Sequence, residues 1–181
     1  MIIIPEAAQT PFSYAIFAQG TALFMSRSLL AALAFVKHVR HQPTASAFTF
    51  QHGLCHDLES LIWVVVYAMM IHQRNIFAAT DQGMFGLYKE ELDHCWAAHA
   101  YSSLQISHNH MVMTGCTDDS LSLVRSWFPD PREAAFFCEA MRLILYSQIG
   151  GGPITYEALC ALFKKHINLA EEQQVVDVVS N

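Results

Sequence analysis

The chain has 181 residues, the length of one ordinary domain, and it is long enough to bury a substantial core. Only 14% of its residues are charged, against about 25% in typical soluble domains, and 53% are apolar. With a net charge of -6 and ten Lys plus Arg, the sequence has no concentrated basic patch, which argues against nucleic-acid binding.

Hydropathy and cysteine usage predict an intracellular protein, cytoplasmic or nuclear. The longest uninterrupted apolar run, residues 61–71, has 11 residues, about half of what a bilayer crossing needs, so we expect a core helix and no membrane span. Residues 1–6 carry neither a basic leader nor a long apolar stretch, so no signal peptide is expected. The five cysteines form no Cys-x-x-Cys pair and are expected to be reduced: Cys55, Cys95, Cys116, Cys138 and Cys160.

The first half of the chain predicts two helices after an irregular segment at 1–19. Ser26 or Ser28 can cap the first helix, which continues to about His38 and ends before Pro43. The second runs from about residue 58 to 72, because it is too long for a usual strand and Asp57 offers a capping carboxylate. This second helix is apolar all round, which predicts burial on all sides.

The second half predicts three further helices. A turn over 80–86 leads to a helix at 87–101 whose buried face carries Tyr88, Leu92, Cys95, Trp96 and His99. Residues 102–120, rich in Ser, His, Asn and Thr, favour an irregular connection. Pro131 introduces a helix at 132–148, and three glycines end it.

The last helix is expected from Thr155, its cap, to His166, followed by a frayed acidic tail at 168–181. Trp63, Trp96 and Trp127 are expected in the core.

Two segments resemble parts of a protein kinase. GTALFMSRSLL at residues 20–30 is similar to the end of an activation segment, and HDLESLIWVVVYAMM at residues 56–70 is similar to the buried helix that follows it. The family with this combination is the fungal-type protein kinases. The substrate-facing loop would correspond to Gly20, Thr21, Phe24, Met25 and Ser26, and the structural anchor of the helix to Asp57, Glu59, Ser60 and Trp63.

The resemblance implies a mainly α-helical bundle like the C-terminal lobe of a protein kinase over residues 20–167, with the N-terminal lobe absent. In kinases the helix after the loop carries an Ala-Pro-Glu triplet, whose glutamate pairs with a distant arginine. Here Ser26, Arg27 and Ser28 occupy the triplet, so the resemblance predicts that this ion pair is lost.

The groups that would transfer phosphate are not found upstream of the loop. Phosphoryl transfer needs a phosphate-binding lysine, a catalytic-loop carboxylate and an Asp-Asn set that holds magnesium. The first lysine is Lys37 and the first aspartate is Asp57, so neither can fill an upstream role. We therefore predict no catalytic residue and no cofactor for this chain, with ATP and magnesium expected only for a full-length family member. Residues 81–83, Asp-Gln-Gly, are predicted to be a turn and not the magnesium-binding tripeptide.

Three functions remain open at this stage. The chain is either part of a serine/threonine kinase, whose class performs ATP-dependent protein phosphorylation, or a pseudokinase-like scaffold. Such a scaffold would bind a protein partner or the missing lobe, and its low charge predicts self-association. A weaker third function is a metal-binding module at His52, Cys55 and His56, which lacks the paired ligand spacing that zinc sites usually show.

Overall fold

The computed structural model describes residues 24–39, 53–96 and 100–166, and every regular element in these ranges is a helix. The predicted mainly α class is confirmed; the likeness to a kinase lobe stays a prediction. The predicted segments at 1–19 and 168–181 lie outside the described residues. The chain divides into two compact units, Met1–Met111 and Val112–Asn181, and their boundary lies within helix α5, Tyr101–Cys116.

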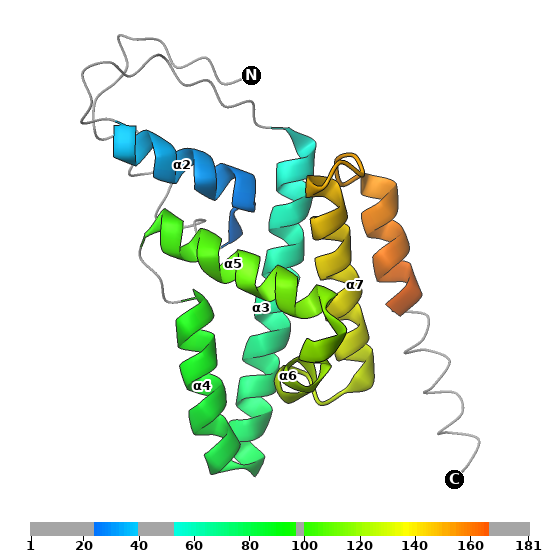
Figure 1. The fold of residues 1–181 in the computed structure, drawn as a ribbon. Coiled ribbons are helices and arrows are strands. Elements are labelled where there is room, and N and C mark those ends of the chain that lie inside the picture. The colour runs from blue at the N-terminus through cyan, green and yellow to red at the C-terminus, as the bar shows by residue number, and fades with distance from the viewer. Residues whose placement is uncertain (1–23, 40–52, 97–99, 167–181) are drawn as a thin grey trace. The chain divides into compact units, whose positions relative to one another are not determined.

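The first unit begins with α2, Arg27–Val39, which Ser26 caps as predicted (Figure 1). The Ser26 hydroxyl accepts a hydrogen bond from the Leu29 amide at 3.3 Å, and its carbonyl accepts from the Leu30 amide at 2.9 Å. Both bonds satisfy amides that the first turn of a helix otherwise leaves unpaired. Leu30 is fully buried, so this helix is attached to its unit from its first turn.

Helix α3, Leu54–Thr80, is 27 residues long and extends beyond both predicted ends. Asp57 was predicted to cap it, and this is wrong: the cap is Gly53, whose amide donates to His56 Nδ1 at 2.9 Å. Asp57 is an exposed residue in the first turn of α3. Its negative charge interacts favourably with the positive end of the helix dipole.

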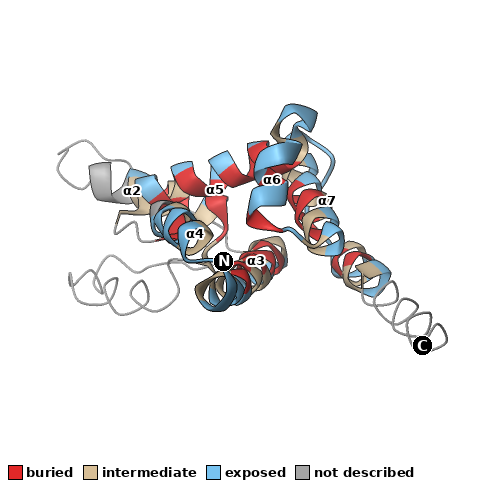
Figure 2. Cartoon of the chain, turned by 90° about the horizontal axis from the view of Figure 1, so that it is seen from below, coloured by how far each residue is buried: buried red, intermediate tan, exposed pale blue. Residues whose placement is uncertain are grey.

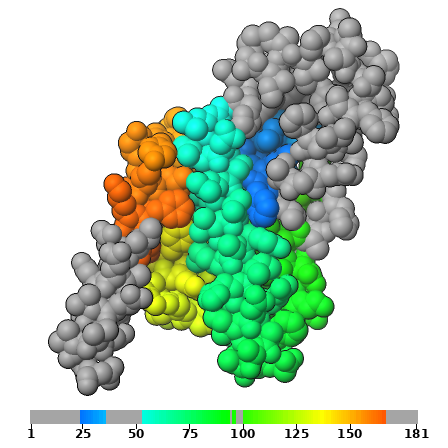
Figure 3. Space-filling model, turned by 180° about the vertical axis from the view of Figure 1, so that it is seen from behind, coloured from blue at the N-terminus to red at the C-terminus, as the bar shows by residue number. Residues whose placement is uncertain are grey.

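The prediction that α3 is buried on all sides is also wrong. Its buried residues follow one stripe of the helix: Leu58, Glu59, Ile62, Trp63, Val66, Met70 and Gln73. Leu54, Leu61 and Val64 are apolar and exposed on the other side. Figure 2 shows both buried and exposed positions on α3, and Figure 3 shows α3 at the surface of the molecule. Within the described residues, α3 is the one helix long and apolar enough to cross a membrane, a test that core helices of soluble proteins also pass.

Helix α4, Gln82–Trp96, packs back along α3 (Figure 1). The turn predicted over 80–86 is limited to Asp81 in the structure. Asp81 Oδ1 accepts hydrogen bonds from the amides of Gly83 and Met84, each at 3.0 Å, so α4 begins directly after Asp81. Its predicted buried face is confirmed at Tyr88, Leu92, Cys95 and Trp96, whereas His99 lies outside the described residues. Tyr88 meets Phe77 of α3 edge to face at 5.4 Å between ring centroids.

The irregular connection predicted over 102–120 is wrong, because most of it is helix α5. In the first unit, α5 buries Leu104, Ser107, His108 and Met111, which follow the i, i+3, i+4, i+7 spacing of one helix face. Burial of this face stabilises a helix whose Ser, His and Asn residues have weak helix propensity.

The second unit contains the short helices η3, Asp118–Ser120, and α6, Leu121–Trp127, and then the long helix α7, Pro131–Gln148. As predicted, Pro131 opens α7, and Asp130 caps it by accepting from the Arg132 amide at 2.8 Å. Phe137 packs edge to face on Trp127 at 5.7 Å. The glycines predicted to end α7 follow it, and Gly150 and Gly152 have φ of 99° and 92°, values that favour glycine.

The last described helix spans residues 156–166, and its predicted cap is confirmed, because the Thr155 hydroxyl accepts from the Ala158 amide at 3.2 Å. It packs on α7 through Phe163, which stacks on Phe136 at 5.6 Å. Lys165 donates to Glu139 Oε1 at 2.5 Å at the end of the same helix pair. These contacts join α7 and the last helix into one hairpin.

Candidate functional site

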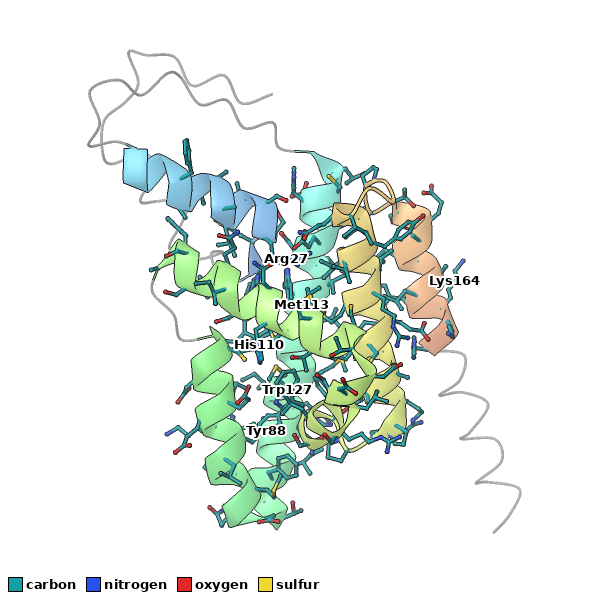
Figure 4. All side chains as sticks on the ribbon, viewed as in Figure 1. Arg27, Tyr88, His110, Met113, Trp127 and Lys164 are labelled. Atoms are coloured by element: carbon teal, nitrogen blue, oxygen red, sulfur yellow. The ribbon has the colours of Figure 1, made fainter. Side chains whose placement is uncertain are left out.

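The two segments on which the kinase resemblance rests meet in the first unit. Arg27, at the start of α2, lies against Glu59 in the second turn of α3, 32 residues later (Figure 4). The Arg27 amide donates to Glu59 Oε1 at 2.9 Å, and its Nε donates to the same oxygen at 3.3 Å. The side chains are only 4% and 6% exposed, so this ion pair is buried.

Two more side chains complete the network around this pair. Trp63, one turn after Glu59, donates its indole Nε1–H to Glu59 Oε1 at 3.2 Å. From α5, Asn109 Oδ1 accepts from Arg27 Nη1 at 3.1 Å. We call Arg27, Glu59, Trp63 and Asn109 the buried polar network, of which Asn109 is the one exposed member. It connects α2, α3 and α5 within the first unit.

The energy of this network depends on its hydrogen bonds. Moving two charges out of water is costly, and the attraction between them offsets this only where further bonds satisfy their polar atoms. Here three N–H donors converge on Oε1 of Glu59, and Asn109 accepts from Nη1 of the guanidinium. Hydrogen bonds to charged groups are the stronger class. The network therefore specifies how α2 sits on α3.

An aromatic cluster lies beside the network. The His108 ring stacks on the Trp63 indole with centroids 4.0 Å apart, and Trp96 of α4 meets His108 edge to face at 5.5 Å. Phe24, just before α2, meets Tyr67 edge to face at 5.4 Å. Trp96 also donates its Nε1–H to Met70 Sδ at 3.3 Å. The predicted core positions of Trp63 and Trp96 are thus confirmed, and Trp127 is buried in the second unit.

The predicted substrate-loop residues divide between described and undescribed positions. Gly20 and Thr21 lie outside the described residues. Phe24 joins the aromatic cluster, Met25 is half-buried, and Ser26 is the fully buried cap of α2. The three described residues of this loop therefore contact the body of the first unit.

The predicted anchor residues of α3 have separate roles. Glu59 and Trp63 lie together in the buried polar network, as described above. Ser60 donates its hydroxyl to the His56 carbonyl of its own helix at 2.8 Å, and Asp57 is exposed. The sequence named four anchors, and the structure brings two of them into one site.

The metal hypothesis gains no geometric support. His52 lies outside the described residues. His56 uses its Nδ1 to accept from the Gly53 amide, and Cys55 is half-buried. Among the described residues, no three His, Cys, Asp or Glu side chains gather closely enough to hold a metal ion.

The chemistry near the aromatic cluster is not that of a nucleophile. Burial raises the pKa of the Cys95 thiol to about 12, and the nearby Glu91 carboxylate adds to this rise. The thiol is therefore protonated at neutral pH, whereas an attacking cysteine must be a thiolate. The described arrangement of this unit holds helices together through buried bonds and ring contacts.

Sequence reasoning missed Arg27, Asn109 and His108 as members of this site. The local signal for Arg27 was a single cation at the start of an apolar helix, and it does not identify a partner. Asn109 and His108 lay in the segment expected to be irregular. Their contacts with residues of α2 and α3 depend on the helical form of α5.

No protein-family model, curated protein sequence or solved structure matches the chain. The function of the chain must therefore be inferred from its own residues and from the resemblance of its two segments.

Proposed function

We propose that the chain is the helical C-terminal-lobe part of a fungal-type serine/threonine protein kinase, a class that performs ATP-dependent protein phosphorylation. We further propose that its own role is protein binding without phosphoryl transfer. The observation that carries the first proposal is the buried contact between Arg27 and Glu59, because it joins the two segments that resemble the family.

The position of this ion pair supports the proposal in a specific way. In kinases the triplet after the substrate loop supplies a glutamate to a buried ion pair. At the aligned triplet this chain has Arg27, and it pairs with Glu59 of the following long helix. The partner and the signs of the charges differ from the kinase pair, but the segment is still tied to the lobe by a buried ion pair. The predicted loss of the kinase pair therefore need not release this loop.

The proposed lack of phosphoryl transfer follows from the residues of the first unit. The buried carboxylate nearest the loop, Glu59, accepts from Arg27 and Trp63, and these bonds occupy Oε1. The exposed Asp57 lies in the first turn of a long helix, and the family pattern gives this position a structural role. A magnesium-holding or proton-accepting carboxylate would need an open position facing the nucleotide or the substrate hydroxyl.

Protein binding is supported by apolar side chains that the fold leaves in solvent. Thirteen large hydrophobic residues are exposed in the described part of the chain, and several of them lie on helices of the first unit: Phe35, Leu54, Leu61, Val64, Ile76, Leu87 and Ile106. Contiguous exposed apolar surface commonly marks a protein interface. If the partner is a kinase lobe, the chain is part of an enzyme. If the partner is another protein, the chain is a pseudokinase-like scaffold.

Nucleotide binding tests the proposed inactivity. The purified chain should show the same melting temperature with and without magnesium and ATP, and it should not phosphorylate casein. A ligand that binds the folded state at 100 times its Kd adds about 2.7 kcal/mol of stability, which a thermal shift would detect. A reproducible rise in melting temperature with magnesium-ATP, absent with magnesium alone, would contradict the proposal.

The transcript upstream of Met1 tests the kinase origin. An in-frame segment with a lysine-bearing strand and a His-Arg-Asp-like loop would make the protein part of an enzyme. An upstream stop codon with no such segment would favour the pseudokinase-like scaffold. An upstream domain of another class would contradict the kinase origin altogether.

A further inference from the structure

We draw no further inference here: the strongest candidate, the apolar face that Leu54, Leu61 and Val64 expose along α3, is an unpartnered helix face, and nothing in the described part of the structure shows what covers it.

Discussion

Replacing Glu59 by alanine should be among the most damaging single changes in the first unit. The substitution removes the one oxygen that accepts from the Arg27 amide, the Arg27 guanidinium and the Trp63 indole. Arg27, whose side chain is only 4% exposed, would then lose the carboxylate that lies 3.3 Å from its Nε. Breaking a buried pair by removing one partner typically costs about 3–5 kcal/mol. Such a loss is a large part of the roughly 5–15 kcal/mol that stabilises a typical protein.

A series of variants separates the contributions of charge and of packing to this loss of stability. Glu59→Gln keeps an oxygen that can accept the same bonds and loses only the charge, so it should cost less than Glu59→Ala. Replacing Arg27 and Glu59 together by methionine removes both charges and fills a similar volume, and it should cost far less than Glu59→Ala alone. Glu90→Ala, at an exposed position of α4, is the control and should change stability by less than about 0.5 kcal/mol.

Urea denaturation followed by circular dichroism measures these differences. For a chain of this size, a loss of about 3–5 kcal/mol corresponds to a fall of roughly 6–20 °C in melting temperature. If Glu59→Ala loses less than about 1 kcal/mol, the ion pair does not hold α2 on α3 as argued. If the double methionine variant is as unstable as Glu59→Ala, the cost comes from packing and not from an uncompensated charge.

Three further predictions concern individual side chains. Gly115→Ala should destabilise by about 1–3 kcal/mol, because the added Cβ would lie 2.6 Å from Met141 Cβ and 3.1 Å from Phe137. Gly86→Ala, a helix position with open space around it, should stabilise by about 0.5–1 kcal/mol, and urea denaturation of both variants checks the contrast. Asp130→Ala should cost about 1 kcal/mol at neutral pH by removing the cap of α7. The hydrogen bond from Arg132 lowers the pKa of Asp130 below 3.8, so the contribution of Asp130 to stability is present above pH 3.8 and is lost as the carboxylate is protonated at lower pH. The unfolding curves of the parent chain and of Asp130→Ala should therefore converge as the pH falls from about 5 to about 2. Cys95, with its pKa raised to about 12, should resist iodoacetamide at pH 8 in the folded chain and react fully in urea; rapid labelling of the native thiol would contradict its burial.

Local chemistry predicted the helix starts well at three places. Ser26 and Thr155 are caps in the structure, because a short polar side chain can accept from amides two or three residues ahead without any distant partner. Pro131 opens α7 as predicted, and the cap that the structure adds there is Asp130. The start of α3 was predicted wrongly by the same reasoning. Glycine is a weaker cap than Asp, but the Gly53 amide gains a bond to His56 that capping preference alone does not include.

The helix α5 shows where local preference fails. Its Ser, His, Asn and Thr residues are typical of a loop, yet it is a helix from Tyr101 to Cys116. The free energy gained by burying Leu104, His108 and Met111 on one helix face outweighs the weak helix propensity of the neighbouring residues. This spacing was present in the sequence and was hidden because Ser107 and His108 are polar residues in the buried face.

The sequence by itself determined that the chain is mainly helical and where several of its helices begin, because apolar periodicity and caps act over a few residues. Only the tertiary structure decided that Arg27 pairs with Glu59, since that contact requires two helices to pack across 32 residues of chain. It also decided that α3 buries one face and exposes the other. The apolar sequence of α3 is nearly uniform around the helix, so its pattern alone could not choose a side; the packing of α4 and the contacts from α2 and α5 did.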